Sequence, residues 1–154
     1  MEQKTKIIAE NGRQELLITR EFDLPVALLF TAYADAGIVE QWMGTKVLKL
    51  ESKKHGGYQF ETTDPLGNKH RFNGVIHEFA LNRKITRTFE MENTPFDVWL
   101  EFLEFEPLGS DTSKLTMHLV FRSLALRDQM LQMPFAQGIG MAHDRLQETA
   151  GKRT

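Results

Sequence analysis

The sequence predicts an α+β fold in which a curved antiparallel sheet wraps around one long C-terminal helix. Three observations predict it. Short β-favouring stretches separated by turns fill residues 45–122. Two short helical patterns precede them, and one long helical pattern at 124–149 follows them. Strands and helices gathered in separate parts of a chain are typical of α+β domains.

The N-terminal part predicts a β-hairpin and two short helices. β-favouring stretches at 6–9 and 15–22 flank Asn11-Gly12, a dipeptide typical of hairpins. Asp23 is expected to cap a helix at 25–34, because Pro25 suits a first helical turn. Asp35 is expected to cap a second helix, which Gly44 ends in the left-handed conformation. One apolar face of the first helix holds Val26, Leu29, Phe30 and Tyr33.

The middle of the chain predicts an antiparallel meander. Its connections are too short for parallel crossovers, which need about a dozen residues or more. The last strand alternates cleanly, so one of its faces must be covered. The expected strands are 47–52, 58–63, 70–79, 85–91, 98–106 and 115–122.

The only segment long enough to cover that face is the C-terminal one. Pro134 interrupts it, so we expect a short helix, a break near Met133 and then the long helix. The apolar face of this segment comprises Leu131, Phe135, Gly138, Ile139, Ala142 and Leu146.

Composition indicates an ordinary soluble protein. The 154 residues are 41% hydrophobic and 26% charged, with no cysteine and a formal charge of −2. These values exclude thiol chemistry and offer no basic field for nucleic acid. No apolar run approaches the roughly 20 residues that span a bilayer. We therefore expect one domain over residues 1–154, in the cytoplasm, with no membrane insertion and no nucleic-acid partner.

Several motifs in this order resemble the SRPBCC (START-like, helix-grip) superfamily, in the branch of the activator of heat-shock protein 90 ATPase homologues. The resemblance runs from about residue 14 to residue 149, and the order of the motifs carries it. The motifs are Ile18-Thr19-Arg20-Glu21-Phe22-Asp23, Leu29-Phe30-Thr31-Ala32-Tyr33, Glu40-Gln41-Trp42, Gly56-Gly57-Tyr58, Asp64-Pro65-Leu66-Gly67-Asn68, Phe72-Asn73-Gly74-Val75-Ile76-His77-Glu78, Thr88-Phe89-Glu90, Leu115-Thr116, Arg127-Asp128 and Asp144-Arg145-Leu146.

The resemblance implies a hydrophobic cavity between the sheet and the long helix. Members of the superfamily include lipid carriers, polyketide cyclases and co-chaperone domains, so the fold does not fix one function. Two departures from the family pattern concern the cavity mouth. Lys54 and His55 stand where an Arg usually precedes the paired glycines, and Pro134 stands where Gly is usual.

Aromatic and apolar side chains on the expected elements are the candidates for a ligand-binding lining. The open alternative is that they fill a dense core. Met130, Met133 and Met141 raise the same two possibilities, as adaptable lining or as core filling. The candidate ligand-binding residues are Phe30, Tyr33, Trp42, Tyr58, Phe60, Phe72, Ile76, Phe89, Trp99, Glu101, Leu103, Met117, Phe135 and Ile139.

Glu101 is the sharpest candidate for orienting a ligand. It shares a strand face with Trp99, Leu103 and Phe105, which carries it inward unless a bulge turns it to solvent. A buried carboxylate must be paired, protonated or bound to a ligand. Glu78 raises the same question on its own strand.

The five histidines are expected to be solvated or hydrogen-bonded at the surface, with no metal site. His70 and His77 are an odd number of residues apart in one strand and so point to opposite faces. The Gly138-Ile139-Gly140 stretch weakens a helix, and a close approach to the sheet or a ligand would offset this.

Three functions remain open. The first is binding of a small hydrophobic or aromatic molecule, with no cofactor and no catalytic residue assigned. The second is a co-chaperone-like interaction with heat-shock protein 90, a stress-response role that only the resemblance implies. The third is a cyclase or hydrolase acting on aromatic polyketide-like substrates. The sequence leaves the oligomeric state open.

Overall fold

A computed structural model describes residues 4–152 and confirms the α+β fold. Eight strands and four helices follow one another in the predicted order, and their bounds lie within about two residues of the expected ones. The elements are β1 (Lys6–Ile8), β2 (Glu15–Phe22), α1 (Val26–Ala34), α2 (Ala36–Met43), β3 (Lys46–Leu50), β4 (Gly57–Thr63), β5 (Lys69–Ala80), β6 (Lys84–Met91), β7 (Trp99–Pro107), β8 (Ser113–Val120), α3 (Leu124–Gln132) and α4 (Phe135–Gly151).

The strands form one antiparallel sheet in the order β1-β2-β8-β7-β6-β5-β4-β3. Strands β3 to β8 are the predicted meander. Strand β2 then joins the sheet beside β8, where Glu15 pairs with Val120 and Phe22 with Ser113. The first hairpin of the chain is thus attached to its last strand.

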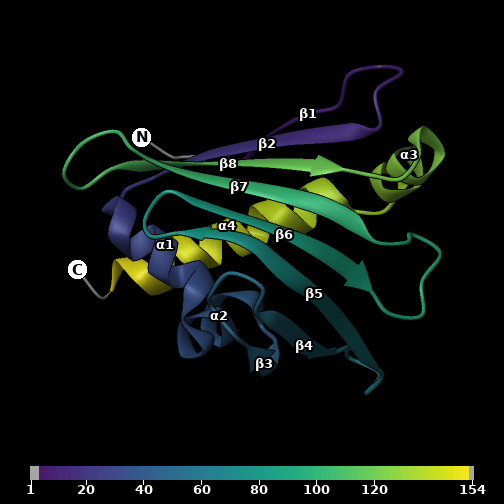
Figure 1. Cartoon of the computed structure of the whole chain (residues 1–154), viewed down its shortest axis with the longest axis horizontal. Coiled ribbons are helices and arrows are strands. Elements are labelled where there is room, and N and C mark those ends of the chain that lie inside the picture. The colour runs from purple at the N-terminus through teal and green to yellow at the C-terminus, as the bar shows by residue number, and fades with distance from the viewer. Residues whose placement is uncertain (1–3, 153–154) are drawn as a thin grey trace.

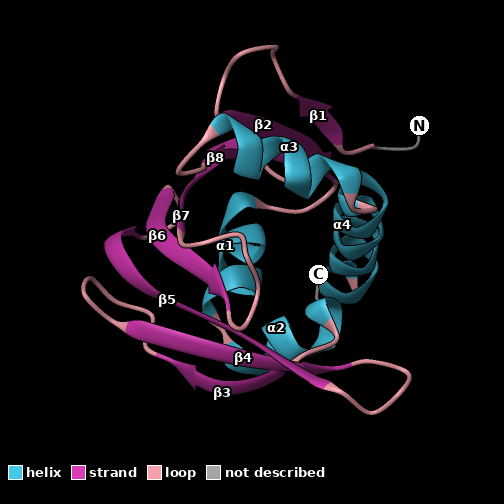
Figure 2. Ribbon diagram, turned by 90° about the vertical axis from the view of Figure 1, so that its right-hand side faces the viewer, coloured by secondary structure: helices cyan, strands magenta, loops and turns pink. Residues whose placement is uncertain are grey.

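The helices lie on the concave side of the sheet. In Figure 1 the long α4 runs behind β6, β7 and β8, and α3 lies beyond one end of the strands. Figure 2 shows the sheet curving around α1, with α2 below that helix and α4 on the open side of the sheet. On β8, Leu115, Met117 and Leu119 are buried against this interior, as their alternation predicted.

The helix ends follow the predictions with one exception. The Asp35 carboxylate accepts a hydrogen bond from the Ile38 N–H at 3.0 Å, and Gly44 has a φ of 64°. The predicted capping of α1 by Asp23 is wrong, because Pro25 occupies the N-cap position and no side chain caps the helix. The Asp23 N–H instead donates to the Gln147 side chain of α4 at 2.8 Å.

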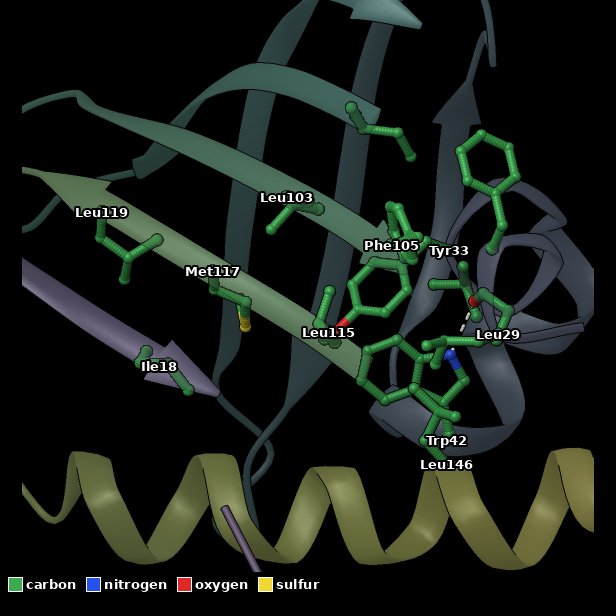
Figure 3. Packing of buried hydrophobic residues seen from close by; sticks show 14 of the residues in the cluster. Ile18, Leu29, Tyr33, Trp42, Leu103, Phe105, Leu115, Met117, Leu119 and Leu146 are labelled. Carbon is green, nitrogen blue, oxygen red and sulfur yellow. Dashed lines mark hydrogen bonds between the residues drawn. The ribbon is translucent and has the colours of Figure 1, made fainter. Parts of the chain in front are cut away.

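The break between α3 and α4 is also confirmed. Helix α3 is capped by Ser123, and its C-cap is Met133. Toward the end of α4, Leu146 and Ala150 are fully buried. Figure 3 shows Leu146 beside Trp42 of α2, and the Arg145 Nε donates to the Trp42 carbonyl oxygen at 2.9 Å. The C-terminal half of α4 is therefore the anchored half.

Within residues 4–152, no helix is both long enough and apolar enough to cross a membrane.

Candidate functional site

A cavity of about 300 Å³ lies between the concave face of the sheet and the N-terminal half of α4. Strands β5 to β8 form its floor, α1 and α2 close one end, and α3 and α4 form the rest of the wall. Met133 and Pro134, both exposed, belong to that wall, so the cavity reaches the surface at the α3–α4 break. Candidate residues from the sequence that lie on the wall are Tyr33, Trp42, Phe72, Phe89, Trp99, Glu101, Met117, Phe135 and Ile139.

The remaining candidates lie in the core and not on the wall. Their side chains are at most 3% exposed and pack against the aromatic cluster and the sheet. Tyr58, for example, reaches across the sheet so that its hydroxyl donates to the Thr88 carbonyl oxygen. These core residues are Phe30, Tyr58, Phe60, Ile76 and Leu103.

Part of the wall consists of residues that were not among the ligand-binding candidates. The two methionines among them come from α2 and β6, and no local pattern reveals that these elements meet at the cavity. Met130 and Met133 had been suggested and do line the cavity, whereas Met141 points away from it and is 52% exposed. The further wall residues are Met43, Arg87, Met91, Leu119, Pro134 and Ala142.

An aromatic stack forms part of the floor. Phe89 of β6 and Trp99 of β7 are directly opposite each other in the strand register. Their rings are stacked, with centroids 4.8 Å apart and planes at 20°. Phe72 of β5 extends the row at 5.7 Å from Phe89. This row gives an apolar aromatic surface that suits an aromatic or aliphatic molecule.

One buried ion pair interrupts the apolar wall. Arg87 and Glu101 are register partners on β6 and β7, and each side chain is about 5% exposed. The Arg87 Nε donates to Glu101 Oε1 at 2.9 Å, and the Trp99 Nε1 donates to Glu101 Oε2 at 2.9 Å. Among the described residues, these two are the charged side chains on the wall.

The predicted inward orientation of Glu101 is confirmed, but its carboxylate is already paired. Each oxygen accepts one hydrogen bond from the protein, so Glu101 holds Arg87 and Trp99 in place. Sequence reasoning missed Arg87. The strand alternation could have revealed it, because Arg87 lies two residues from both Ile85 and Phe89 on β6, and all three face inward.

Aromatic rings surround the guanidinium group of Arg87. Its carbon lies 5.0 Å from the ring centre of Tyr58, and 6.0 Å from those of Tyr33 and Phe89. Such contacts stabilise a desolvated cation. Burial raises the pKa of the Tyr33 and Tyr58 hydroxyls well above their usual range, so both stay neutral.

Glu78 lies outside the cavity. A β-bulge in β5 inserts His77 between Ile76, which pairs with Arg87, and Glu78, which pairs with Thr86. The extra residue reverses the alternation, so Phe79 turns inward and Glu78 turns to solvent. There Glu78 pairs with Lys84 at 3.1 Å.

A family model described as "Activator of Hsp90 ATPase homolog 1-like protein" matches residues 23–151. The chain belongs to this family. No curated protein matches the sequence.

Several solved structures share the fold of this Hsp90-activator-homologue chain at low identity. Protein Ms6760 from Mycobacterium smegmatis is 20% identical with a TM-score of 0.85, over 94% of this chain and 95% of that one. A Rhodobacter sphaeroides protein is 16% identical with a TM-score of 0.87, over 97% and 99%. An Arthrobacter aurescens protein is 18% identical with a TM-score of 0.85, over 96% and 91%. At these identities the likeness shows the fold.

The two departures from the family pattern lie in different places. Lys54 and His55 form the turn between β3 and β4, where His55 has a φ of 67° and its N–H donates to the Ile76 carbonyl oxygen at 2.7 Å. Neither belongs to the cavity wall. Pro134 does, and it is the N-cap residue of α4.

The expectation that all histidines lie at the surface is wrong for His143 of this family member. His143 is fully buried under β1 and β2, where its Nδ1 shares a hydrogen bond with Thr5 Oγ1 at 2.7 Å. Its Nε2 has no hydrogen-bond partner among the described residues. Burial, aided by the nearby positive charge of Arg20, lowers the pKa of His143 from 6.5 to about 4, although Asp144 opposes the shift.

The other histidines do not gather into a metal site. His70 is exposed and hydrogen-bonds Asp64 at 3.0 Å, while His118 is half-exposed beside Glu15. Within residues 4–152, no three histidine or acidic side chains are placed to hold a metal ion.

Of the two close approaches suggested for the α4 glycines, the one to the sheet is wrong. A methyl group at Gly138 or Gly140 would meet no other atom within 4 Å. Each glycine therefore costs helix stability, about 1 kcal/mol relative to Ala, with no packing that requires it. Both lie in the half of α4 that covers the cavity, and that half contains no fully buried residue before His143.

Proposed function

We propose that the protein binds a small, mostly apolar molecule in the cavity beneath the N-terminal half of α4. The observation that supports this most directly is the apolar cavity of about 300 Å³ at the centre of the fold. Protein interiors are close-packed, and voids larger than a water molecule are few. Small-molecule sites begin at about this volume and combine an apolar wall with a few polar groups.

The cover of the cavity is suited to letting such a molecule in. Met130 and Met133 lie beside the break that separates α3 from α4, and flexible thioether side chains adapt to different shapes. Gly138 and Gly140 weaken the first turns of α4 without contributing to packing. Opening this half of α4 leaves the anchored half around Leu146 in place.

Native mass spectrometry of the protein as purified from cells tests the proposal first. A native mass that exceeds the denatured mass by a constant amount supports a bound molecule, and the difference identifies its mass. The purified protein is then titrated with medium-chain and two-ring aromatic compounds while Trp fluorescence is followed, because Trp42 and Trp99 both lie on the wall.

A pair of matched variants on α4 distinguishes binding in the cavity from binding elsewhere. Ala142→Phe places a ring on the cavity wall, whereas Ala136→Phe places the same ring on the exposed side of the same helix. We expect Ala142→Phe to weaken binding at least about tenfold, a cost of about 1.4 kcal/mol. Ala136→Phe should bind like the wild type. Equal affinities for the two variants would contradict a site in this cavity.

The family match favours a second candidate, an interaction with heat-shock protein 90. The description of the family names activation of that ATPase, and the match extends over residues 23–151. A pull-down with purified heat-shock protein 90 and a measurement of its ATP turnover test this role. If the protein neither binds heat-shock protein 90 nor changes its ATP turnover, this candidate function is removed.

An enzymatic role, such as polyketide cyclisation or hydrolysis, would have to use an acid or base at the cavity. Glu101 is the acidic side chain on the wall, and both of its oxygens accept hydrogen bonds from Arg87 and Trp99. Glu78 is exposed on the other face of β5. Turnover that is unchanged in both Glu101→Gln and Glu78→Gln would exclude carboxylate catalysis.

A further inference from the structure

The cavity offers hydrogen-bond donors to a ligand and almost no acceptors. Both Glu101 oxygens already accept from Arg87 and Trp99, and the Trp99 N–H is used in the same contact. The Trp42 N–H is used as well, because it donates to the Ala32 carbonyl oxygen. The side chains of the wall then leave the distal nitrogens of Arg87 and the hydroxyl of Tyr33. A guanidinium group can only donate, so the wall selects for an acceptor.

The distal nitrogens of Arg87 are reachable from the cavity. Among the described residues, the side-chain hydrogen bond of Arg87 goes from Nε to Glu101, and no partner takes Nη1 or Nη2. The fully buried side-chain nitrogens without a partner in this part of the chain are Arg20 Nε and His143 Nε2. Since Arg87 Nη1 and Nη2 are not among them, they touch the free space that Arg87 lines.

The position of this group is fixed before any ligand arrives. Glu101 holds the guanidinium through Nε, and the rings of Tyr33, Tyr58 and Phe89 flank it within 6.0 Å. Tyr58 is itself held by its hydrogen bond to the Thr88 carbonyl oxygen. A preorganised donor in a desolvated site interacts more strongly than the same donor in water.

We infer that the ligand carries a carboxylate, which the Nη1 and Nη2 groups of Arg87 bind while its apolar part lies along Phe89 and Trp99. The planar guanidinium edge matches a carboxylate and forms two parallel N–H···O bonds. Glu101 compensates the Arg87 charge from the Nε side and leaves the distal edge free. This inference rests on the proposed function and adds the chemical class of the ligand.

The volume limits the apolar part of this acid. About 300 Å³ is near the lower end of the range for small-molecule sites. Medium-chain fatty acids and two-ring aromatic acids fit that class, whereas a sterol or a diacyl lipid would need the cover to open. The probes are therefore octanoate, decanoate and dodecanoate, each compared with the primary alcohol of the same chain length.

Calorimetric titration of the wild-type protein with these acid–alcohol pairs tests the carboxylate inference separately from the proposed function. We expect at least one acid to bind about tenfold tighter than its alcohol, because a hydrogen bond to a charged group in a desolvated site is among the stronger ones. An alcohol that binds as tightly as its acid overturns the carboxylate inference and leaves the proposed function standing. If none of the acids, alcohols and aromatic probes binds, the result counts against the proposed function itself.

Variants of the ion pair then assign the preference to Arg87. Arg87→Met alone leaves Glu101 buried without its partner, so the matched variant is the double substitution Arg87→Met/Glu101→Gln, which removes both charges together. The double variant should lose the preference for each acid over its alcohol, so that the two bind within about twofold of each other. A double variant that keeps this preference refutes the role of Arg87.

A crystal structure of the wild-type protein with decanoate gives the same answer without any variant. The carboxylate is expected within hydrogen-bond distance of Arg87 Nη1 or Nη2. A carboxylate that points to solvent at the α3–α4 break, with the chain in the cavity, would overturn the inference.

Discussion

Lowering the pH below neutrality should destabilise the protein through one residue, His143. The buried ring titrates at a pKa of about 4 in the folded chain, against 6.5 in the unfolded chain. Between these values the unfolded state binds a proton that the folded state does not, so stability falls as pH falls. The contribution is fully present above pH 6.5 and is lost progressively down to pH 4.

The size of the effect follows from the two pKa values. They differ by about 2.5, and each pKa unit corresponds to about 1.36 kcal/mol, so the full loss is about 3 kcal/mol. At pH 5 about 2 kcal/mol of it is already lost. The carboxylates whose pKa is lowered by folding interfere little above pH 5. Their ordinary pKa values, 4.5 for Glu51 and Glu92 and 3.8 for Asp64, already lie below that pH.

Urea unfolding at pH 7.5 and pH 5, for the wild type and for His143→Gln, measures this term. The amide can still hydrogen-bond Thr5 but does not titrate. Arg20 and Asp144 face the ring from β2 and α4. Both are present in the two proteins, so their own contributions to the pH dependence cancel in the comparison. We expect the wild type to lose about 2 kcal/mol more than the variant. Equal losses, or an NMR titration of His143 near 6.5, would refute the reasoning.

Other predictions concern the helix cover and the ion pair, and each is checked by urea unfolding at pH 7.5. Gly138→Ala and Gly140→Ala should each stabilise the protein by about 1 kcal/mol, since an added methyl group meets open space; a loss of stability would show that these turns need glycine. Gly74→Ala should instead cost about 1–3 kcal/mol, because the methyl group would strike the Thr88 carbonyl oxygen and the Tyr58 hydroxyl; an unchanged midpoint would contradict that contact. Arg87→Met should cost about 3–5 kcal/mol, and the addition of Glu101→Gln should recover most of it; a double variant as unstable as the single one would argue against an unpaired charge as the cause.

Local patterns were sufficient to predict the elements of this fold. The Asp35 cap, the Gly44 end of α2 and the break at Met133 each depend on residues within one turn of each other. The alternation of β8 likewise reports burial residue by residue. The pairing of β2 with β8 was beyond such patterns, because nothing near Glu15 indicates that Val120 will lie opposite.

The wall of the cavity was predicted only in part, for a related reason. Aromatic residues on inward faces, such as Phe89 and Trp99, were placed correctly, whereas Phe60 and Leu103 have the same pattern but lie behind the wall. Whether an inward side chain meets free space depends on the elements packed over it. A single inserted residue, His77, also reversed the face of Glu78, and no turn residue marks that bulge.

The attachment of β2 to β8 sets an order on how the molecule can assemble. The floor of the cavity is built from β5 to β8, but the hairpin that supports its far edge comes from the beginning of the chain. That hairpin has no sheet to join until β8 has been synthesised. Helix α4 follows β8 and is anchored to the hairpin, where Asp144 accepts a hydrogen bond from Arg20 and Gln147 accepts one from the Asp23 N–H. Pairings between residues so distant in sequence make folding slow. The emerging protein therefore exposes an unpaired hydrophobic hairpin until β8 has been synthesised, and the cavity gains its cover only when α4 has followed.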